Sequence, residues 1–183
     1  MSLGDCSNHN TYCNSDVYAS SINAAVEQGI AVIVSAGNCI YSSCVIKPSC
    51  TTGPASPACV ESATAIGAVN DIDDIYYQRG NLFELLAPGV SIYSATFSGS
   101  WTDKSGTSMS APHVSGAVAL LQQTAKLQNG SVALSPRQIE LLLNSTGKVI
   151  DDSGGSGNNF KRIDIQAAVL ALDSTGPVVN FNS

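Results

Sequence analysis

A segment near the middle of the chain combines small side chains with a hydroxyl group that could act as a nucleophile. Residues 105–113 read SGTSMSAPH and directly precede apolar residues at helical spacing. Ser108 would lie at a helix N-terminus, where free N–H groups and the helix dipole favour the negative charge that develops during acyl transfer. Gly106 has no side chain, so an extended peptide could approach its backbone closely. This pattern indicates attack by Ser108 on a carbonyl carbon.

Three other interpretations of this segment are weaker. An isolated serine before a helix most often caps that helix. The α/β-hydrolase nucleophile turn requires G-x-S-x-G, but Ser110 occupies the final glycine position. His113 cannot act as the base for Ser108, because five residues of helix rotate its imidazole by about 140° and displace it by about 7.5 Å. We therefore expect His113 to be a packed helix residue.

The longer segment 106–116 (GTSMSAPHVSG) resembles the nucleophile motif of subtilisin-like serine proteases. Residues 25–38 (AVEQGIAVIVSAGN) and 87–92 (APGVSI) are similar to segments of the same family, in the same order. The resemblance extends over about residues 1–172. It implies a serine endopeptidase with a three-layer α/β fold and a mostly parallel sheet, incomplete at its N-terminal side.

The resemblance also implies roles for individual residues. Ser108 would be the nucleophile, and the Asn38 side chain would join the Ser108 N–H in holding the oxyanion, a contribution of about 2.7–4 kcal/mol in the transition state. Residues 35–37 would form one wall of the S1 pocket, which takes the side chain before the scissile bond. Residues 2–4 would pair with the substrate backbone as a strand. The substrate-binding residues implied in this way are Ser2, Leu3, Gly4, Ser35, Ala36, Gly37, Gly106 and Thr107.

The chain departs from the family in its acid and base. The catalytic Asp and His of the family lie upstream, in D-[ST]-G and H-G-T-H motifs, and neither motif occurs here. His9 matches neither motif and is expected to lie in an exposed loop. Without a base the Ser108 hydroxyl is a weak nucleophile, so we expect this chain to be inactive by itself. The alternative is a non-catalytic peptide-binding or structural module that keeps the groove.

No metal ligand is predicted. The aspartates at 71, 73 and 74 lack EF-hand spacing and are typical of a solvated turn. Calcium binding is suggested only by the family resemblance, and no residue is assigned as a calcium ligand. The resemblance also suggests a cis bond before Pro57, in a turn beside the pocket.

The cysteines predict disulfides and an extracellular location. No C-x-x-C pair occurs, so zinc-ligand spacing is poor. Six cysteines allow 15 connectivities. Among these we favour nearest-neighbour pairing, with Cys50–Cys59 best supported because a Pro-rich turn lies between them. Three disulfides indicate a secreted protein, although residues 1–20 contain no signal peptide. The six residues are Cys6, Cys13, Cys39, Cys44, Cys50 and Cys59.

Composition narrows the set of partners. With 44% hydrophobic and 12% charged residues in 183, the chain is globular rather than disordered. Its net charge of -6 supplies no basic stripe for nucleic acid or for an anionic membrane surface. No apolar run is long enough to span a bilayer. The partner that we expect is a peptide or protein substrate.

Hydrophobic periodicity predicts the elements that position the site. Helices are expected at 17–28, 108–125 and 165–172, and another should begin at Ser135 with a capping box and end before Gly147. Strands are expected at 31–34, 63–69, 82–86 and 91–95. Segments 39–59 and 151–159 are rich in turn residues and should be irregular.

The domain is expected to span residues 1–173, with a tail at 174–183. Residues 1–4 resemble the substrate-binding strand, so we expect Met1 to be an internal methionine of a longer protein. The missing strands would leave one edge of the parallel sheet bare. Such an edge should lead to self-association, or the chain should be kept monomeric only by the disulfide-linked segment.

Overall fold

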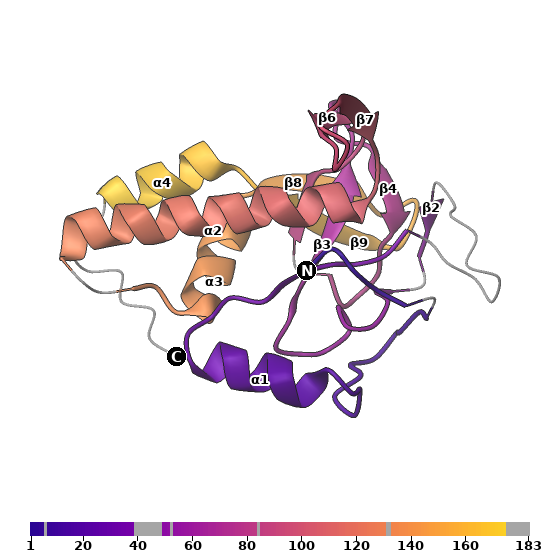
Figure 1. Cartoon of the computed structure of the whole chain (residues 1–183), viewed down its shortest axis with the longest axis horizontal. Coiled ribbons are helices and arrows are strands. Elements are labelled where there is room, and N and C mark those ends of the chain that lie inside the picture. The colour runs from indigo at the N-terminus through magenta and orange to yellow at the C-terminus, as the bar shows by residue number, and fades with distance from the viewer. Residues whose placement is uncertain (6, 39–48, 52, 84, 131–132, 175–183) are drawn as a thin grey trace.

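The computed structural model describes residues 1–5, 7–38, 49–51, 53–83, 85–130 and 133–174 (Figure 1). The predicted tail, apart from Ser174, lies outside the described residues. The helices are α1 (Ala19–Glu27), α2 (Thr107–Asn129), α3 (Pro136–Thr146) and α4 (Ile165–Ser174). The strands are β1 (Ile33–Ser35), β2 (Ser49–Cys50), β3 (Thr64–Val69), β4 (Ile75–Gln78), β5 (Leu85–Pro88), β6 (Ile92–Ala95), β7 (Trp101–Lys104), β8 (Lys148–Asp152) and β9 (Asn158–Arg162).

The main sheet is mostly parallel, as predicted. Its strand order is β2-β4-β3-β5-β9-β8, and β1 also pairs with β3. β3 is parallel to β1 and β5, and β5 is parallel to β9. β3 is buried along its whole length, because helices or loops cover both of its faces. This explains why its sequence is apolar without alternation.

Helices cover both faces of the sheet, which makes three layers. Ile33 and Ile66 pack with Val114 of α2 in the largest core cluster. Their chain neighbours Val34 and Ala65 pack in a second cluster with α1. Because successive strand residues point to opposite faces, α1 and α2 lie on opposite sides of the sheet. The three-layer α/β prediction is therefore confirmed.

Three helix predictions are confirmed with small shifts of their ends. α2 runs from residue 107 to 129 rather than 108–125, and α1 and α4 lie within two residues of the predicted bounds. α3 begins with the expected capping box, in which Ser135 Oγ accepts from the Gln138 N–H and Gln138 Oε1 accepts from the Ser135 N–H. Local signals sufficed for these helices because each end is set by residues near it in the chain.

The expectation of irregular structure at 151–159 was wrong. These residues form the turn and flanking strands of the β8–β9 hairpin, in which Ile150 pairs with Phe160. Both side chains are buried in a cluster with Val69 and Leu86. The polar turn residues gave no local signal for this hairpin, because its stability comes from contacts with distant strands. β2, β4 and β7 were also missed.

In the predicted solvated turn, Asp71 and Asp74 are exposed as expected, but Asp73 is not. Asp73 forms ion pairs with Lys148 and Arg162, at 2.6 and 2.8 Å. Its side chain is only 16% exposed, because the β8–β9 hairpin covers it. The pairs connect the turn after β3 to the distant strands β8 and β9.

The predicted Cys50–Cys59 bond is also wrong. Cys59 is bonded to Cys13, 46 residues away. The loop before α1 packs against the turn at 54–61, which brings Cys13 next to Cys59. The Cys13 N–H also donates to the Cys59 carbonyl at 3.0 Å. Residues Cys6, Cys39 and Cys44 lie outside the described residues.

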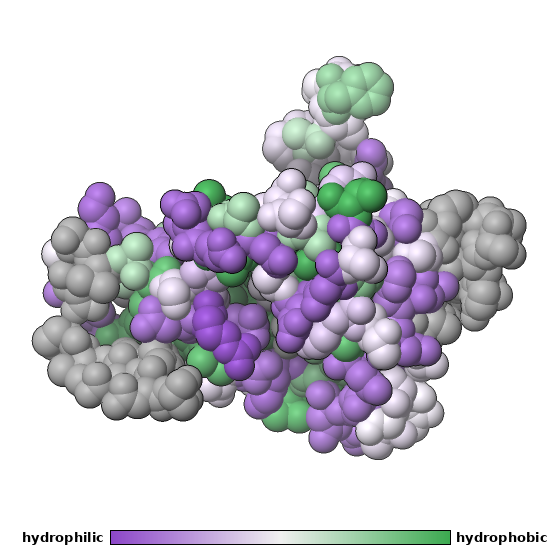
Figure 2. All heavy atoms as spheres, turned by 90° about the horizontal axis from the view of Figure 1, so that it is seen from below, coloured by the Kyte–Doolittle hydropathy of each residue, from purple (hydrophilic) through white to green (hydrophobic). Residues whose placement is uncertain are grey.

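The first residue of the chain lies at the edge of the sheet. Met1 donates from its amino group to the Ile33 carbonyl and accepts from the Ser35 N–H, on the side of β1 away from β3. At this edge, Met1 and Leu3 are more than 40% exposed. On the face drawn in Figure 2, hydrophilic residues predominate and hydrophobic ones are scattered among them. Among the described helices, none combines the length and apolarity needed to cross a bilayer.

Candidate active site

Ser108 lies in the first turn of α2, as predicted. Gly106 precedes this helix with φ +153°, a conformation that L side chains rarely adopt. A Cβ at this position would lie 3.1 Å from Asn38 Nδ2. Glycine therefore allows the Asn38 side chain to approach the start of the helix. Within the first turn, the Met109 N–H donates to the Gly106 carbonyl at 2.9 Å.

Asn38 is held against the start of α2 by hydrogen bonds to its oxygen. Asn38 Oδ1 accepts from the Thr107 N–H at 2.9 Å and from Thr107 Oγ1 at 3.1 Å. Thr107 Oγ1 in turn accepts from the Gly37 N–H at 3.1 Å. Thr107 is almost fully buried, so this network lies beneath the surface. Oδ1 accepts both bonds, and Nδ2 of the same amide carries two N–H donors that are able to bind a ligand.

Ser2 is tied to Ser108 because of a proline inside α2. Pro112 has no N–H, so the Ser108 carbonyl lacks its usual helix donor. Ser2 Oγ donates to this carbonyl at 2.9 Å instead. The first residues of the chain are thereby anchored beside the proposed nucleophile.

A pocket of about 220 Å³ connects most of the predicted substrate-binding residues with Ser108 and Asn38. Ala36 is fully buried and does not line it. Gly106 packs against Asn38 behind the pocket. Asp5 lines the pocket but was not predicted, although it directly follows the segment that resembles the substrate strand. The lining residues are Ser2, Leu3, Gly4, Asp5, Ser35, Gly37, Asn38, Thr107 and Ser108.

A second, larger groove of about 630 Å³ also reaches Ser108. It lies between the β6–β7 hairpin and the start of α2, which contributes Ser108, Met109, Pro112 and His113. Sequence reasoning missed this groove because β6 was expected as an ordinary strand. In the structure, β6 pairs with β7 as a separate two-stranded sheet (Figure 1).

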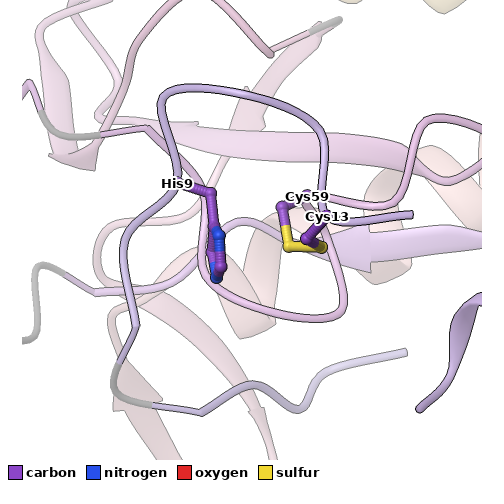
Figure 3. A group of neighbouring side chains, drawn as sticks. All are labelled: His9, Cys13 and Cys59. Carbon is purple, nitrogen blue, oxygen red and sulfur yellow. A yellow bond between two sulfur atoms is a disulfide. The ribbon is translucent and has the colours of Figure 1, made fainter. Parts of the chain in front are cut away.

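Both histidines form hydrogen bonds away from Ser108. His113 Nδ1 donates to the Met109 carbonyl at 2.8 Å, which confirms a histidine packed on its own helix. His9 Nε2 bonds Ser7 Oγ at 2.8 Å. His9 is half-buried beside the Cys13–Cys59 disulfide rather than exposed, contrary to the prediction (Figure 3). Over the described residues, the structure shows no hydrogen bond from either histidine to Ser108.

The His9 cluster contains residue types that could bind a metal. The ligand atoms of His9, Cys13 and Cys59 lie within 4.8 Å of one another. The two sulfur atoms are bonded to each other, so neither is a thiolate that could coordinate a metal. The Cys13–Cys59 disulfide therefore links two loops covalently, and His9 lies beside it.

A polar network lies behind the smaller pocket. Ser56 Oγ donates to Asp16 Oδ2 at 2.6 Å, and the Ser56 N–H donates to Asp5 Oδ1 at 3.2 Å. The bond from Ser56 and the Tyr18 N–H lower the pKa of Asp16 below its ordinary value. The bond between Ser56 and Pro57 is cis, as the family resemblance suggested.

Fold and site together define an α/β domain in which a serine at a helix N-terminus faces an asparagine at the end of a parallel strand. Residues 1–162 match the model of the Subtilase family, and the chain belongs to that family.

Two relatives and one solved structure illustrate this similarity. The chain is 35% identical over 140 residues to alkaline serine exoprotease A of Vibrio alginolyticus, covering 74% of this chain and 23% of that protein. It is 34% identical over 158 residues to an extracellular protease of Xanthomonas campestris, covering 82% and 25%. It thus spans about a quarter of each relative. The patellamide maturation protease PatA has a similar fold, with a TM-score of 0.72 at 21% identity over 94% of this chain and 63% of that one.

Proposed function

We propose that this chain forms the nucleophile and oxyanion-binding part of a subtilisin-like serine endopeptidase. The observation that supports this best is the Asn38–Thr107 network. It holds the amide of Asn38 beside Ser108 and directs its remaining donors away from Thr107. Preorganised donors of this kind stabilise an oxyanion because they need no reorientation during the reaction.

The two pockets indicate how a peptide would bind. The side chain before the scissile bond would enter the smaller pocket, and the leaving-group side would lie along the groove beside β6–β7. Ser108 Oγ would attack the carbonyl carbon between them and transfer its proton to a base. The carbonyl oxygen would become an oxyanion bound by Asn38 Nδ2 and the Ser108 N–H. Loss of the amine would leave an acyl-enzyme that water hydrolyses.

The purified chain should react slowly with a fluorophosphonate probe. Both histidines form hydrogen bonds elsewhere, so within the described part of the chain neither histidine is placed to accept the Ser108 proton. The measurement is intact-mass spectrometry after timed exposure, with Ser108→Ala as the control. Rapid stoichiometric labelling at Ser108 would contradict the absence of a base.

Endopeptidase activity is tested in the product of the extended gene. If the reading frame upstream of Met1 encodes D-[ST]-G and H-G-T-H, that product should cleave peptides and lose both cleavage and labelling in Ser108→Ala. The engaged histidines also support a non-catalytic peptide-binding module. Peptide binding without labelling in the extended product would favour that alternative.

We propose further that the protein is extracellular and contains three disulfides. The Cys13–Cys59 bond and the relative described as extracellular support this proposal. Intact mass should rise by about six hydrogens on reduction. Alkylation of all six thiols without reductant would contradict it.

Self-association is also proposed, through the edge that residues 1–3 form beside β1, because Met1 and Leu3 are exposed there. Light scattering should show mass rising with concentration. A monomer throughout the concentration series would contradict the proposal.

A further inference from the structure

Of the described residues that line the smaller pocket, one carries a charge. Asp5 lies among lining residues that are otherwise uncharged, and it follows Gly4 directly. Gly4 and Gly37 line the same pocket, and neither has a side chain that could enter it. A carboxylate in such a pocket favours a cationic group over a neutral group of the same shape.

The Asp5 carboxylate is held in place by its surroundings. Asp5 Oδ1 accepts from the Ser7 N–H at 2.9 Å, from the Ser7 hydroxyl and from the Ser56 N–H at 3.2 Å. The Asp5 N–H also donates to the Ser56 carbonyl at 3.0 Å. Donors on Oδ1 restrict the orientation of the carboxyl group, so less conformational freedom is lost when a ligand binds. Because the hydrogen bonds to Oδ1 fix the carboxylate, they also fix the position of Oδ2.

We propose that Asp5 makes this pocket selective for lysine or arginine before the scissile bond. The inference rests on the proposed function, because it assigns the pocket to that substrate side chain. The substrate ammonium or guanidinium would bind Asp5, while its aliphatic stem would lie along Leu3 and between the two glycines. The net charge of -6 also favours approach of a cationic peptide.

The first experiment uses the unmodified chain. Acetyl-tripeptide methylamides that differ only in the last residue, arginine, citrulline or phenylalanine, are titrated by calorimetry. Citrulline has nearly the shape of arginine but no charge. Arginine should bind about tenfold tighter than citrulline, the size of effect typical of a hydrogen bond to a charged group. The ratio should shrink as salt concentration rises.

The second experiment uses Asp5→Asn, which keeps an acceptor for Ser7 and Ser56 but removes the charge. This variant should bind the arginine and citrulline peptides equally. Asp71→Asn, an exposed carboxylate in another turn, serves as the matched control and should keep the arginine preference. Thermal unfolding followed by circular dichroism checks that both variants fold.

The outcomes separate this inference from the function on which it rests. Equal binding of arginine and citrulline by the unmodified chain would overturn the role of Asp5 and leave the peptide groove in place. Failure of all three peptides to bind would overturn the groove itself, and the specificity with it. Both results come from the unmodified chain, so they test the proposal even if Asp5→Asn does not fold.

Discussion

At the scale of single residues, the bond between Asn38 and Thr107 connects two segments that lie 69 positions apart. In Asn38→Ala, the buried Thr107 N–H loses its acceptor. We expect the free energy of unfolding to fall by about 1–3 kcal/mol, as measured by urea denaturation. Asn38→Asp keeps the acceptor and should be less destabilised. Equal losses in the two variants would contradict this assignment.

A second residue-scale prediction concerns the ion pair between Arg79 and Asp152. The nitrogen–oxygen distance is 2.5 Å, and the side chains are only 10% and 12% exposed. Burial alone would raise the pKa of Asp152. Hydrogen bonds from Arg79 and Ser156, together with the charge of Arg79, outweigh this effect, so the pKa lies below its ordinary value. The pair therefore stabilises the fold above the unfolded pKa of about 3.9, and this stability is lost as pH falls through the folded pKa.

Arg79→Met should lower the free energy of unfolding at pH 7 by about 3–5 kcal/mol, because it leaves the Asp152 charge buried without its cation. At pH 3 the loss should be smaller. Arg137→Met is the control, since the Arg137 side chain is 68% exposed and its pair with Glu140 should contribute about 0.2–0.5 kcal/mol. Urea titrations at both pH values measure these differences, and a loss independent of pH would exclude the linkage.

At the scale of elements, the start of α3 depends on reciprocal bonds between Ser135 and Gln138. Ser135→Ala removes one of them and should destabilise the protein by about 0.5–2 kcal/mol. Ser145 lies in the last turn of the same helix and donates to the Leu142 carbonyl. Ser145→Ala should be close to neutral, because alanine has the higher helix propensity. Thermal unfolding of both variants tests the prediction, which fails if they shift the midpoint equally.

At the scale of the whole molecule, the Cys13–Cys59 disulfide fastens the loop before α1 to the turn behind the smaller pocket. It closes a loop across a separation of 46 residues. Replacing both cysteines with serine should lower the free energy of unfolding by about 4 kcal/mol, because the unfolded chain gains the entropy of that loop. The measurement is urea denaturation without reductant.

The control for the disulfide is Asn14→Ala. Asn14 connects the same two segments by hydrogen bonds with Glu61 but forms no covalent link. Its loss should cost about 1 kcal/mol. A disulfide variant no less stable than Asn14→Ala would show that the loop entropy is small in this chain.

The sequence by itself determined the features that depend on neighbouring residues. The capping box starts α3, and the buried runs in β1 and β3 show no alternation because both faces are covered. The nucleophile segment at 105–113 was identified because its residues are consecutive and their order is specific. Each of these signals lies within about a dozen positions of the chain.

Only the tertiary structure decided which distant residues meet. Cys59 bonds Cys13 rather than Cys50, residues 150 and 160 pair across a polar turn, and Asp5 joins the pocket near Ser108. Local propensity carries little information about such pairs, since the entropy of closing a long loop changes slowly with its length. The choice among partners is therefore made by burial and hydrogen bonding in the packed molecule, where strand register and loop packing are settled together.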